Sequence, residues 1–352
     1  VYYPDVGREQ KDDNPNATFA LVDGVALYGG FAGTETLLSE RAWATNITVL
    51  SGDLAQDDTV NSNGVVEDVD DQDGTQSLHV VTVGSAGGDT LLDGFTITAG
   101  QGGNGGGLIN NGTPTLQNLI FEGNSGNKGG AIYSEGNATL TNVTFTHNYG
   151  NKGGALYSVN SPILEAVNFI SNEAATDGGG MYHVGSAQMN RIIFAGNKAG
   201  AEGGGLFQYA DHWTPGALLL ENVLFSGNLA VENGGGFFHQ AWASPNQTPT
   251  IRNATFSGNY AKGRAGALGV RNSTVAVYNA ILWENSASNQ ASEDLYAESG
   301  IITVQDALMD TTCNATTCTD ISAGDPRFAT AITPSNQTPS TAGDFRLLPG
   351  SA

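Results

Sequence analysis

The sequence is dominated by an imperfect repeat of about 24 residues. A seven-residue phrase with alternating apolar positions, such as TLTNVTF, ends at positions separated by 24, 24, 24, 25, 31, 31 and 26 residues. These end points are Ile97, Phe121, Phe145, Phe169, Phe194, Phe225, Phe256 and Leu282. A second phrase, paired small residues followed by an apolar residue, ends at Leu108, Ile132, Leu156, Met181, Leu206, Phe237 and Leu268. Two landmarks that keep step over seven copies predict a solenoid of stacked units.

The unit of this solenoid is built from short strands. Its apolar segments alternate with polar residues, and no stretch shows the 3.6-residue period of a helix. One coil of such strands cannot bury its apolar face, but stacked coils can, because each strand pairs in parallel with its copy in the next coil. Paired glycines permit the tight corners. We therefore expect an all-β, right-handed parallel β-helix with rungs of about 24 residues.

Equivalent positions of the repeat predict the core. Inward columns are expected at Leu116, Leu140, Leu164, Met189, Leu220, Ile251 and Val277, and at the phenylalanines that end the first phrase. The last apolar residues of the second phrase should form a third column. An asparagine three residues after the first phrase recurs from the second copy on, and we interpret it as an internal hydrogen-bonded ladder. Its members are Asn124, Asn148, Asn172, Asn197, Asn228, Asn259 and Asn285.

The regularity of the repeat divides one continuous solenoid into three parts. Residues 1–90 contain strand-like pieces separated by polar loops and are expected to form irregular N-terminal rungs and a cap. Residues 91–288 form the regular coils, and residues 289–352 form a looser C-terminal closing segment. Cys313 and Cys318 lie in this last part. They are predicted to form a local disulfide, because two thiols alone do not make a zinc site.

Composition excludes several classes of protein. The formal net charge is -22, from 13 Lys+Arg against 35 Asp+Glu, which argues against a nucleic-acid partner. No apolar run reaches the roughly 18 to 20 residues of a membrane span. Gly is abundant at 49 of 352 residues, but it has no three-residue period, so a collagen helix is excluded.

The repeat resembles known bacterial sequences. The GGA[I/L]…FxxN pattern resembles polymorphic outer-membrane proteins, and the wider pattern is similar to secreted right-handed β-helix proteins of the choice-of-anchor Q type. The stretches Leu27–Thr36 with Arg41, Val49–Asp53, Leu92–Ile97 and Asp325–Phe328 carry that likeness. The resemblance implies an exported, surface-associated β-helix, with its export signal and anchor outside this sequence. It implies no particular chemistry.

Two features make a carbohydrate-active site worth testing. Asp177 and Glu202 are equivalent residues of neighbouring rungs, so they are expected about 5 Å apart, a separation that suits a retaining glycosidase. Lys152 beside Asp177 is the only plausible proton acceptor for a lyase. A mixed-charge column of weak salt bridges explains the same residues without any chemistry.

Two insertions at the same point of consecutive rungs form the second feature. They are expected to project together and to present Tyr209, His212, Trp213, His239 and Trp242 as a ligand-binding surface. An aromatic column precedes them, at Tyr133, Tyr157, Tyr182, Phe207 and Phe238. Strand alternation turns this column outward, so it either offers an exposed face for sugar or protein contact or is covered by the insertions.

The acidic stretch 67–74 is the candidate metal site. Asp68, Asp70, Asp71 and Asp73 precede a glycine, and Ca²⁺ is the one cofactor that such carboxylates would suit. The spacing departs from an EF-hand because Val69 stands where an acid is needed. A solvated acidic loop is the alternative interpretation.

These observations favour an extracellular structural or adhesive β-helix at a bacterial cell surface. Its expected partners are other copies of itself, stacked end to end or side by side, or cell-surface glycans. The alternative is a carbohydrate-binding or carbohydrate-active β-helix, similar to a polysaccharide lyase or glycosidase. The sequence favours a protein that is not an enzyme, without settling the matter.

Overall fold

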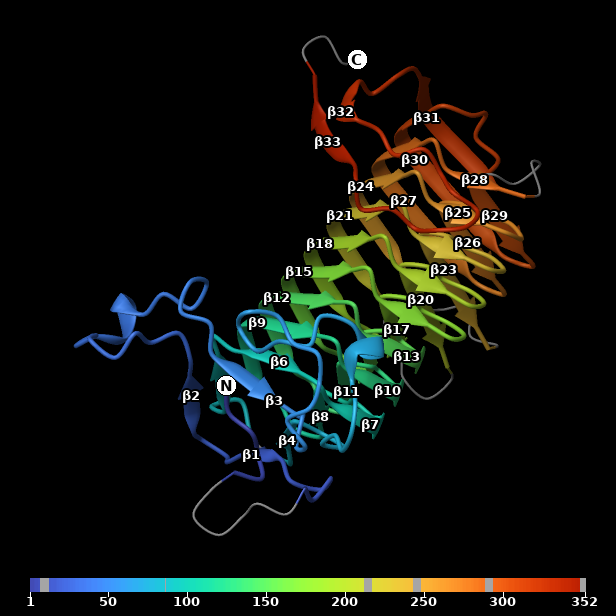
Figure 1. The fold of residues 1–352 in the computed structure, drawn as a ribbon. Helices are drawn as coiled ribbons and strands as arrows, with labels where there is room; N and C mark the ends of the chain where they lie inside the picture. The colour runs from blue at the N-terminus through green and yellow to red at the C-terminus, as the bar shows by residue number, and fades with distance from the viewer. Residues whose placement is uncertain (7–12, 86, 212–216, 243–247, 289–293, 349–352) are drawn as a thin grey trace.

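A computed structural model describes residues 1–352 except 7–12, 86, 212–216, 243–247, 289–293 and 349–352. Parallel strands wind around a common axis, and each regular rung contributes one strand to each of three sheets. Figure 1 shows the rungs stacked one after another along this axis, with the blue N-terminal part and the red C-terminal part at opposite ends. The expected right-handed parallel β-helix is confirmed.

The described strands fall into three parallel sheets and one small antiparallel pair. The first sheet contains β1 (Phe19–Leu21), β4 (Val81–Val83), β8 (Leu108–Asn110), β11 (Ile132–Ser134), β14 (Leu156–Asn160), β17 (Met181–Gly185), β20 (Leu206–Ala210), β23 (Phe237–Ala241), β26 (Leu268–Arg271) and β29 (Leu295–Glu298). The second contains β7 (Gln101–Asn104), β10 (Ser125–Lys128), β13 (Tyr149–Lys152), β16 (Glu173–Ala174), β19 (Lys198–Ala199), β22 (Leu229–Ala230), β25 (Tyr260–Ala261) and β28 (Ser286–Ala287).

The third sheet carries the first phrase of the repeat. Its strands are β2 (Ala26–Tyr28), β3 (Val49–Ser51), β5 (Leu91–Asp93), β6 (Thr96–Thr98), β9 (Thr115–Glu122), β12 (Thr139–Thr146), β15 (Ile163–Ile170), β18 (Gln188–Ala195), β21 (Leu219–Ser226), β24 (Thr250–Ser257), β27 (Thr274–Trp283), β30 (Ile301–Met309) and β31 (Thr317–Ala323). Strands β32 (Phe328–Thr330) and β33 (Asp344–Leu347) pair antiparallel near the C-terminus.

The register of these sheets follows the repeat residue by residue. Phe121, Phe145 and Phe169 are paired neighbours in β9, β12 and β15, and the same column continues to Phe256. Their rings stack with centroids 4.7 to 5.2 Å apart and are fully buried. The predicted leucine and second-phrase columns are also paired and buried, which confirms the predicted core.

The asparagine column forms the predicted internal ladder. Asn172 is typical: its side-chain amide donates to Asn197 Oδ1 at 3.0 Å and to the Phe145 carbonyl at 3.0 Å. Its own Oδ1 accepts from both the backbone and the side-chain N–H groups of Asn148. The same pattern runs from Asn124 to Asn285, which ends on Asp294 Oδ1 at 3.0 Å. The ladder satisfies corner backbone groups that would otherwise be buried without partners.

A row of left-handed residues lies at the same corner as the asparagine ladder. The residue that precedes each ladder asparagine has a positive φ: Gly227, for example, has φ 58° and His147 has φ 49°. Glycine stands at this corner where another segment lies against it. A Cβ on Gly227 would lie 2.0 Å from the Ser340 carbonyl oxygen, and one on Gly258 would lie 2.6 Å from Ile332 Cγ2. The C-terminal segment thus runs back along this edge of the solenoid.

The N-terminal rungs contain short strands joined by long connecting segments. Two single-turn 3₁₀ helices, η1 (Leu38–Glu40) and η2 (Val69–Asp71), lie in their connecting segments. Tyr2 forms a parallel bridge with Leu50, and Asp53 forms an antiparallel bridge with Gln76, so segments distant in sequence close the first coil. At the other end, Cys313 forms a disulfide with Cys318 of β31.

Candidate functional site

The proposed carboxylate pair lies where the sequence places it, but its second member is already occupied. The Glu202 backbone N–H donates to Asp177 Oδ1 at 3.4 Å, and Lys152 Nζ lies 3.6 Å from Asp177 Oδ2. The Glu202 side chain is only 7% exposed and receives both ends of the Arg271 guanidinium, at 2.7 and 2.9 Å. Asn233 adds a third hydrogen bond at 3.0 Å.

These contacts decide what Glu202 can do. Burial raises the pKa of Glu202, while Arg271 and Asn233 act in the opposite direction. Both of its oxygens accept charge-assisted hydrogen bonds from one rigid fork, so neither is free to donate a proton to a substrate or to attack it. Arg271 also binds Glu298 at 2.7 Å and caps the ring of Phe238 at 5.0 Å. The arrangement clamps four consecutive rungs together rather than forming a catalytic pair.

The aromatic column is stacked, and most of it is covered. Its rings lie 4.9 to 6.0 Å apart along the rungs. Of its members, Tyr133, Tyr182, Phe207 and Phe238 are buried, so an exposed aromatic face is the wrong interpretation for them. Long cationic side chains lie over the rings: Lys128 is 5.2 Å from the centre of Tyr157, and Lys152 is 5.0 Å from that of Tyr182.

The insertion residues lie in different environments. His239 is fully buried, which corrects the expectation that it projects: β23 continues to Ala241, so strand alternation turns His239 inward, where Nε2 lies 2.8 Å from Ser273 Oγ. Burial lowers its pKa to about 3. Tyr209 is partly buried against the aromatic column, whereas Trp242 is 69% exposed. His212 and Trp213 lie outside the described residues.

The acidic stretch does not gather into one cluster. Asp68 caps the single turn of η2 by accepting from the Asp70 N–H at 3.2 Å, and Asp68, Asp70 and Asp73 are exposed. Within the described ranges, the group of three acids close enough to share an ion is Asp53, Asp57 and Asp58. None of the predicted ligands Asp68, Asp70, Asp71 and Asp73 belongs to it, because the turn spreads their side chains over a solvated surface.

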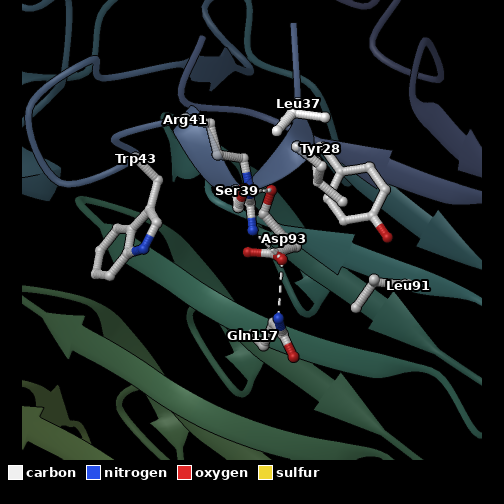
Figure 2. A pocket seen from close by; sticks show the side chains of 9 residues that line it. Tyr28, Leu37, Ser39, Arg41, Trp43, Leu91, Asp93 and Gln117 are labelled. Carbon is white, nitrogen blue, oxygen red and sulfur yellow. Dashed lines mark hydrogen bonds and ion pairs between the residues drawn. The ribbon is translucent and has the colours of Figure 1, made fainter. Parts of the chain in front are cut away.

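A pocket that sequence reasoning missed lies beside the N-terminal arm (residues 30–48). It has a volume of about 670 Å³ and is lined by Tyr28, Leu37, Leu38, Ser39, Arg41, Trp43, Leu91, Asp93 and Gln117. Figure 2 shows Trp43 and Tyr28 on opposite sides of Arg41 and Asp93. The pocket combines aromatic and aliphatic walls with a polar floor, the usual make-up of a small ligand site.

The floor of this pocket is a buried ion pair that anchors the arm. Arg41 binds the Asp93 carboxylate, donates to the Gly29 carbonyl at 3.1 Å and lies 5.1 Å from the centre of the Tyr28 ring. Gln117 and Asn118 each donate to Asp93 at 2.8 Å (Figure 2 draws the first of these bonds). With its carboxylate saturated, Asp93 fixes the arm to β5 of the third sheet and is no candidate for acid–base chemistry.

The arm itself is ordered by its own carboxylates. Glu35 accepts hydrogen bonds from the N–H groups of residues 32–34, and Glu40 accepts from those of residues 36 and 37. These backbone donors hold the pKa of both glutamates below the usual value. Figure 1 shows the arm standing out beside β2 in blue. The sequence signal was present in the GGFAGTETLLSER stretch, but it indicated only family likeness.

Comparison with known proteins gives one informative match. A family model described as "Right handed beta helix region" matches residues 80–294. The chain belongs to this family. No curated protein and no solved structure shows significant similarity to this β-helix. Among the described residues, none of the helices is long and apolar enough to cross a membrane.

Proposed function

We propose that this β-helix is a non-catalytic, extracellular structural or adhesive element of a bacterial cell surface. The likeness of its repeats to choice-of-anchor Q and polymorphic outer-membrane proteins supports export. The Cys313–Cys318 disulfide agrees with an oxidising compartment. Its regular coils provide a stiff scaffold on which a contact surface can be held, because each rung is bound to its neighbours along three sheets.

The observation that carries the proposal is the exposed apolar surface of the N-terminal arm. Leu37 is 62% exposed, and Phe31 and Leu38 are also exposed, although the backbone of the arm is fixed by Glu35, Glu40 and the Arg41–Asp93 pair. An ordered projection that displays several exposed apolar side chains is typical of a contact surface. The edge strand β2 beside it has β5 as its neighbour on one side only. We therefore propose the arm as the site through which copies of this chain, or surface partners, are held.

Carbohydrate binding is the second candidate. The specific observation in its favour is the pocket of Figure 2, where Tyr28 and Trp43 flank a polar floor that includes Ser39 and Gln117. Aromatic side chains beside hydrogen-bonding groups are suited to sugar rings. The exposed Trp242 is a further aromatic contact. Cleavage of a polysaccharide is less well supported, because Glu202 is bound by Arg271.

The test compares the wild-type chain with the Leu37→Ser/Leu38→Ser double variant. Sedimentation velocity and electron microscopy over a range of concentrations report self-association, and a glycan array reports sugar binding. Ile163→Ser is the matched control, because Ile163 is an exposed aliphatic residue on the regular coils. We expect the arm variant alone to lose association. A monomer that binds nothing on the array, or equal behaviour of all three proteins, would contradict the proposal.

A further inference from the structure

The N-terminal coil contains buried oxygen atoms that receive no hydrogen bond. They are both carboxylate oxygens of Asp5, Oδ2 of Asp58 and Oε1 of Gln76. Asp5 lies three residues after Tyr2, and Asp53 lies three residues after Leu50, the bridge partner of Tyr2. Buried polar atoms are nearly always satisfied, so a group of unpaired acceptors at one end of the molecule calls for a positive partner.

Asp58 belongs to a compact group of carboxylates. One oxygen each from Asp53, Asp57 and Asp58 lie within 4.8 Å of one another. Asp53 is buried and uses its oxygens to accept from the N–H groups of Asp57 and Asp58, at 3.2 and 3.3 Å. Like charges held this close are stabilised when a cation neutralises them.

A second segment completes the group from the other side. The Asp73 N–H and the Gln76 side chain donate to Asp58 Oδ1 at 2.6 and 2.7 Å. Gly74 allows this approach, because a Cβ there would lie 2.5 Å from Asp57 Oδ1. The antiparallel bridge between Asp53 and Gln76 fixes the two segments against each other. The result is a cradle of oxygen atoms built from residues 53–58 and 73–76.

Gln76 is the residue that points to a ligand. It is 6% exposed and directed at the carboxylates, with Nε2 between Asp58 Oδ1 and the Asp73 carbonyl oxygen while Oε1 has no partner. A half-turn of the amide exchanges nitrogen and oxygen without changing its shape. Without an ion, Nε2 keeps its two hydrogen bonds; with a cation in the cradle, the exchange turns Oε1 toward the ion as a further oxygen ligand.

We propose that Asp53, Asp57, Asp58, the Gln76 side-chain oxygen and the Asp73 main-chain carbonyl form a Ca²⁺ site. Ca²⁺ takes about six to eight oxygen ligands from carboxylates, amides and carbonyls in flexible geometry, whereas Mg²⁺ demands a near-ideal octahedron and retains its waters. The ion ties together two segments of the irregular first rungs that the repeat does not hold in register. It therefore acts as a clip at the N-terminal end of the solenoid.

Calorimetric titration of the chelator-treated chain with CaCl₂ tests the site. We expect one Ca²⁺ per chain and a higher melting temperature with Ca²⁺ than with EDTA. Asp58→Asn should weaken binding by at least about tenfold. Asp70→Asn makes the same charge change in the exposed turn η2 and should bind like the wild type. Equal weakening by both variants indicates diffuse counterion binding and overturns the proposal, as does a wild-type chain that neither binds nor responds to millimolar Ca²⁺.

A second variant covers the case in which Asp58→Asn fails to fold. Gln76→Glu replaces the amide with a carboxylate in the same position. It should lower the melting temperature in EDTA, because it adds a like charge, and show a larger rise on addition of Ca²⁺ than the wild type. Melting of Gln76→Glu that is independent of Ca²⁺ contradicts the site. Titration with MgCl₂ distinguishes a Ca²⁺ site from a general divalent-cation site.

Discussion

Removing one member of the asparagine ladder should destabilise this β-helix strongly. In Asn172→Ala, the Phe145 carbonyl loses the side-chain donor at 3.0 Å, and the Asn148 backbone N–H loses its acceptor at 3.1 Å. Other contacts survive, because the Asn148 amide still donates to the Phe121 carbonyl at 2.9 Å and Asn197 Oδ1 still accepts from the Asn172 backbone. The Asn148 backbone N–H is thus left buried without its partner, and the Phe145 carbonyl, which belongs to the β12–β15 ladder, loses its side-chain donor.

A buried, unpaired backbone group costs about 1–3 kcal/mol and a lost hydrogen bond about 1 kcal/mol, so the expected loss of stability is about 3 kcal/mol. Urea unfolding followed by circular dichroism measures it from the shift in midpoint and the slope. Asn151→Ala is the matched control: Asn151 is exposed, and its side chain donates a single bond to Asn127 at 3.2 Å. It should cost less than about 0.5 kcal/mol. Similar losses for the two variants would refute the reasoning that the ladder satisfies the corner.

Three further predictions follow from the same structure. Gly227→Ala places a Cβ 2.0 Å from the Ser340 carbonyl at a φ of 58°, so it should loosen the C-terminal segment and speed proteolysis between residues 331 and 343, whereas Ser171→Ala, at a corresponding corner with φ 53°, should not. His239 is buried, and its pKa is lowered to about 3 in the folded chain. In the unfolded chain this histidine has the usual pKa near 6.5, so between these two values only the unfolded chain binds the proton. The stability contributed by neutral His239 is therefore complete above about pH 6.5 and falls as the pH drops, by about 2 kcal/mol at pH 5. Urea midpoints should therefore change less between pH 7 and pH 5 in His239→Gln than in the wild type. Ala265 has φ 60° where preceding rungs have glycine, so Ala265→Gly should increase the free energy of unfolding by up to about 1 kcal/mol, measured as a higher urea midpoint. A lower midpoint would show that the alanine is not strained.

The regular coils could be predicted because the spacing of the repeat along the chain sets the register between neighbouring strands. Once equivalent residues recur every 24 or 25 positions, parallel pairing of each strand with its copy follows, and with it the Phe, Leu and Asn columns. The residue type that precedes each ladder asparagine also carries information about packing at that corner. Glycine precedes the ladder asparagine at Gly196, Gly227 and Gly258, where the C-terminal segment packs, while His147 and Ser171 occupy the same corner where that segment is absent.

The sites could not be predicted in the same way, because they depend on contacts outside the repeat. Arg271 binds Glu202, which lies 69 residues earlier in the sequence. No pattern of charges in the sequence predicts that this side chain spans two rungs. The carboxylates of Asp53 and Asp58 meet Gln76 through an antiparallel bridge in the irregular rungs. His239 was misplaced because the length of β23 depends on its pairing with β20 rather than on its own sequence.

Amide hydrogen exchange of the wild-type chain tests the central claim, that the N-terminal arm is the contact surface, most directly. Exchange is measured in three samples: the dilute chain, the chain at a concentration where sedimentation shows association, and the chain with any glycan that the array selects. Our account predicts added protection concentrated in residues 30–43 and in β2, with the regular coils unchanged. Protection that appears instead around Trp242, or an arm that exchanges identically in all conditions, would contradict it.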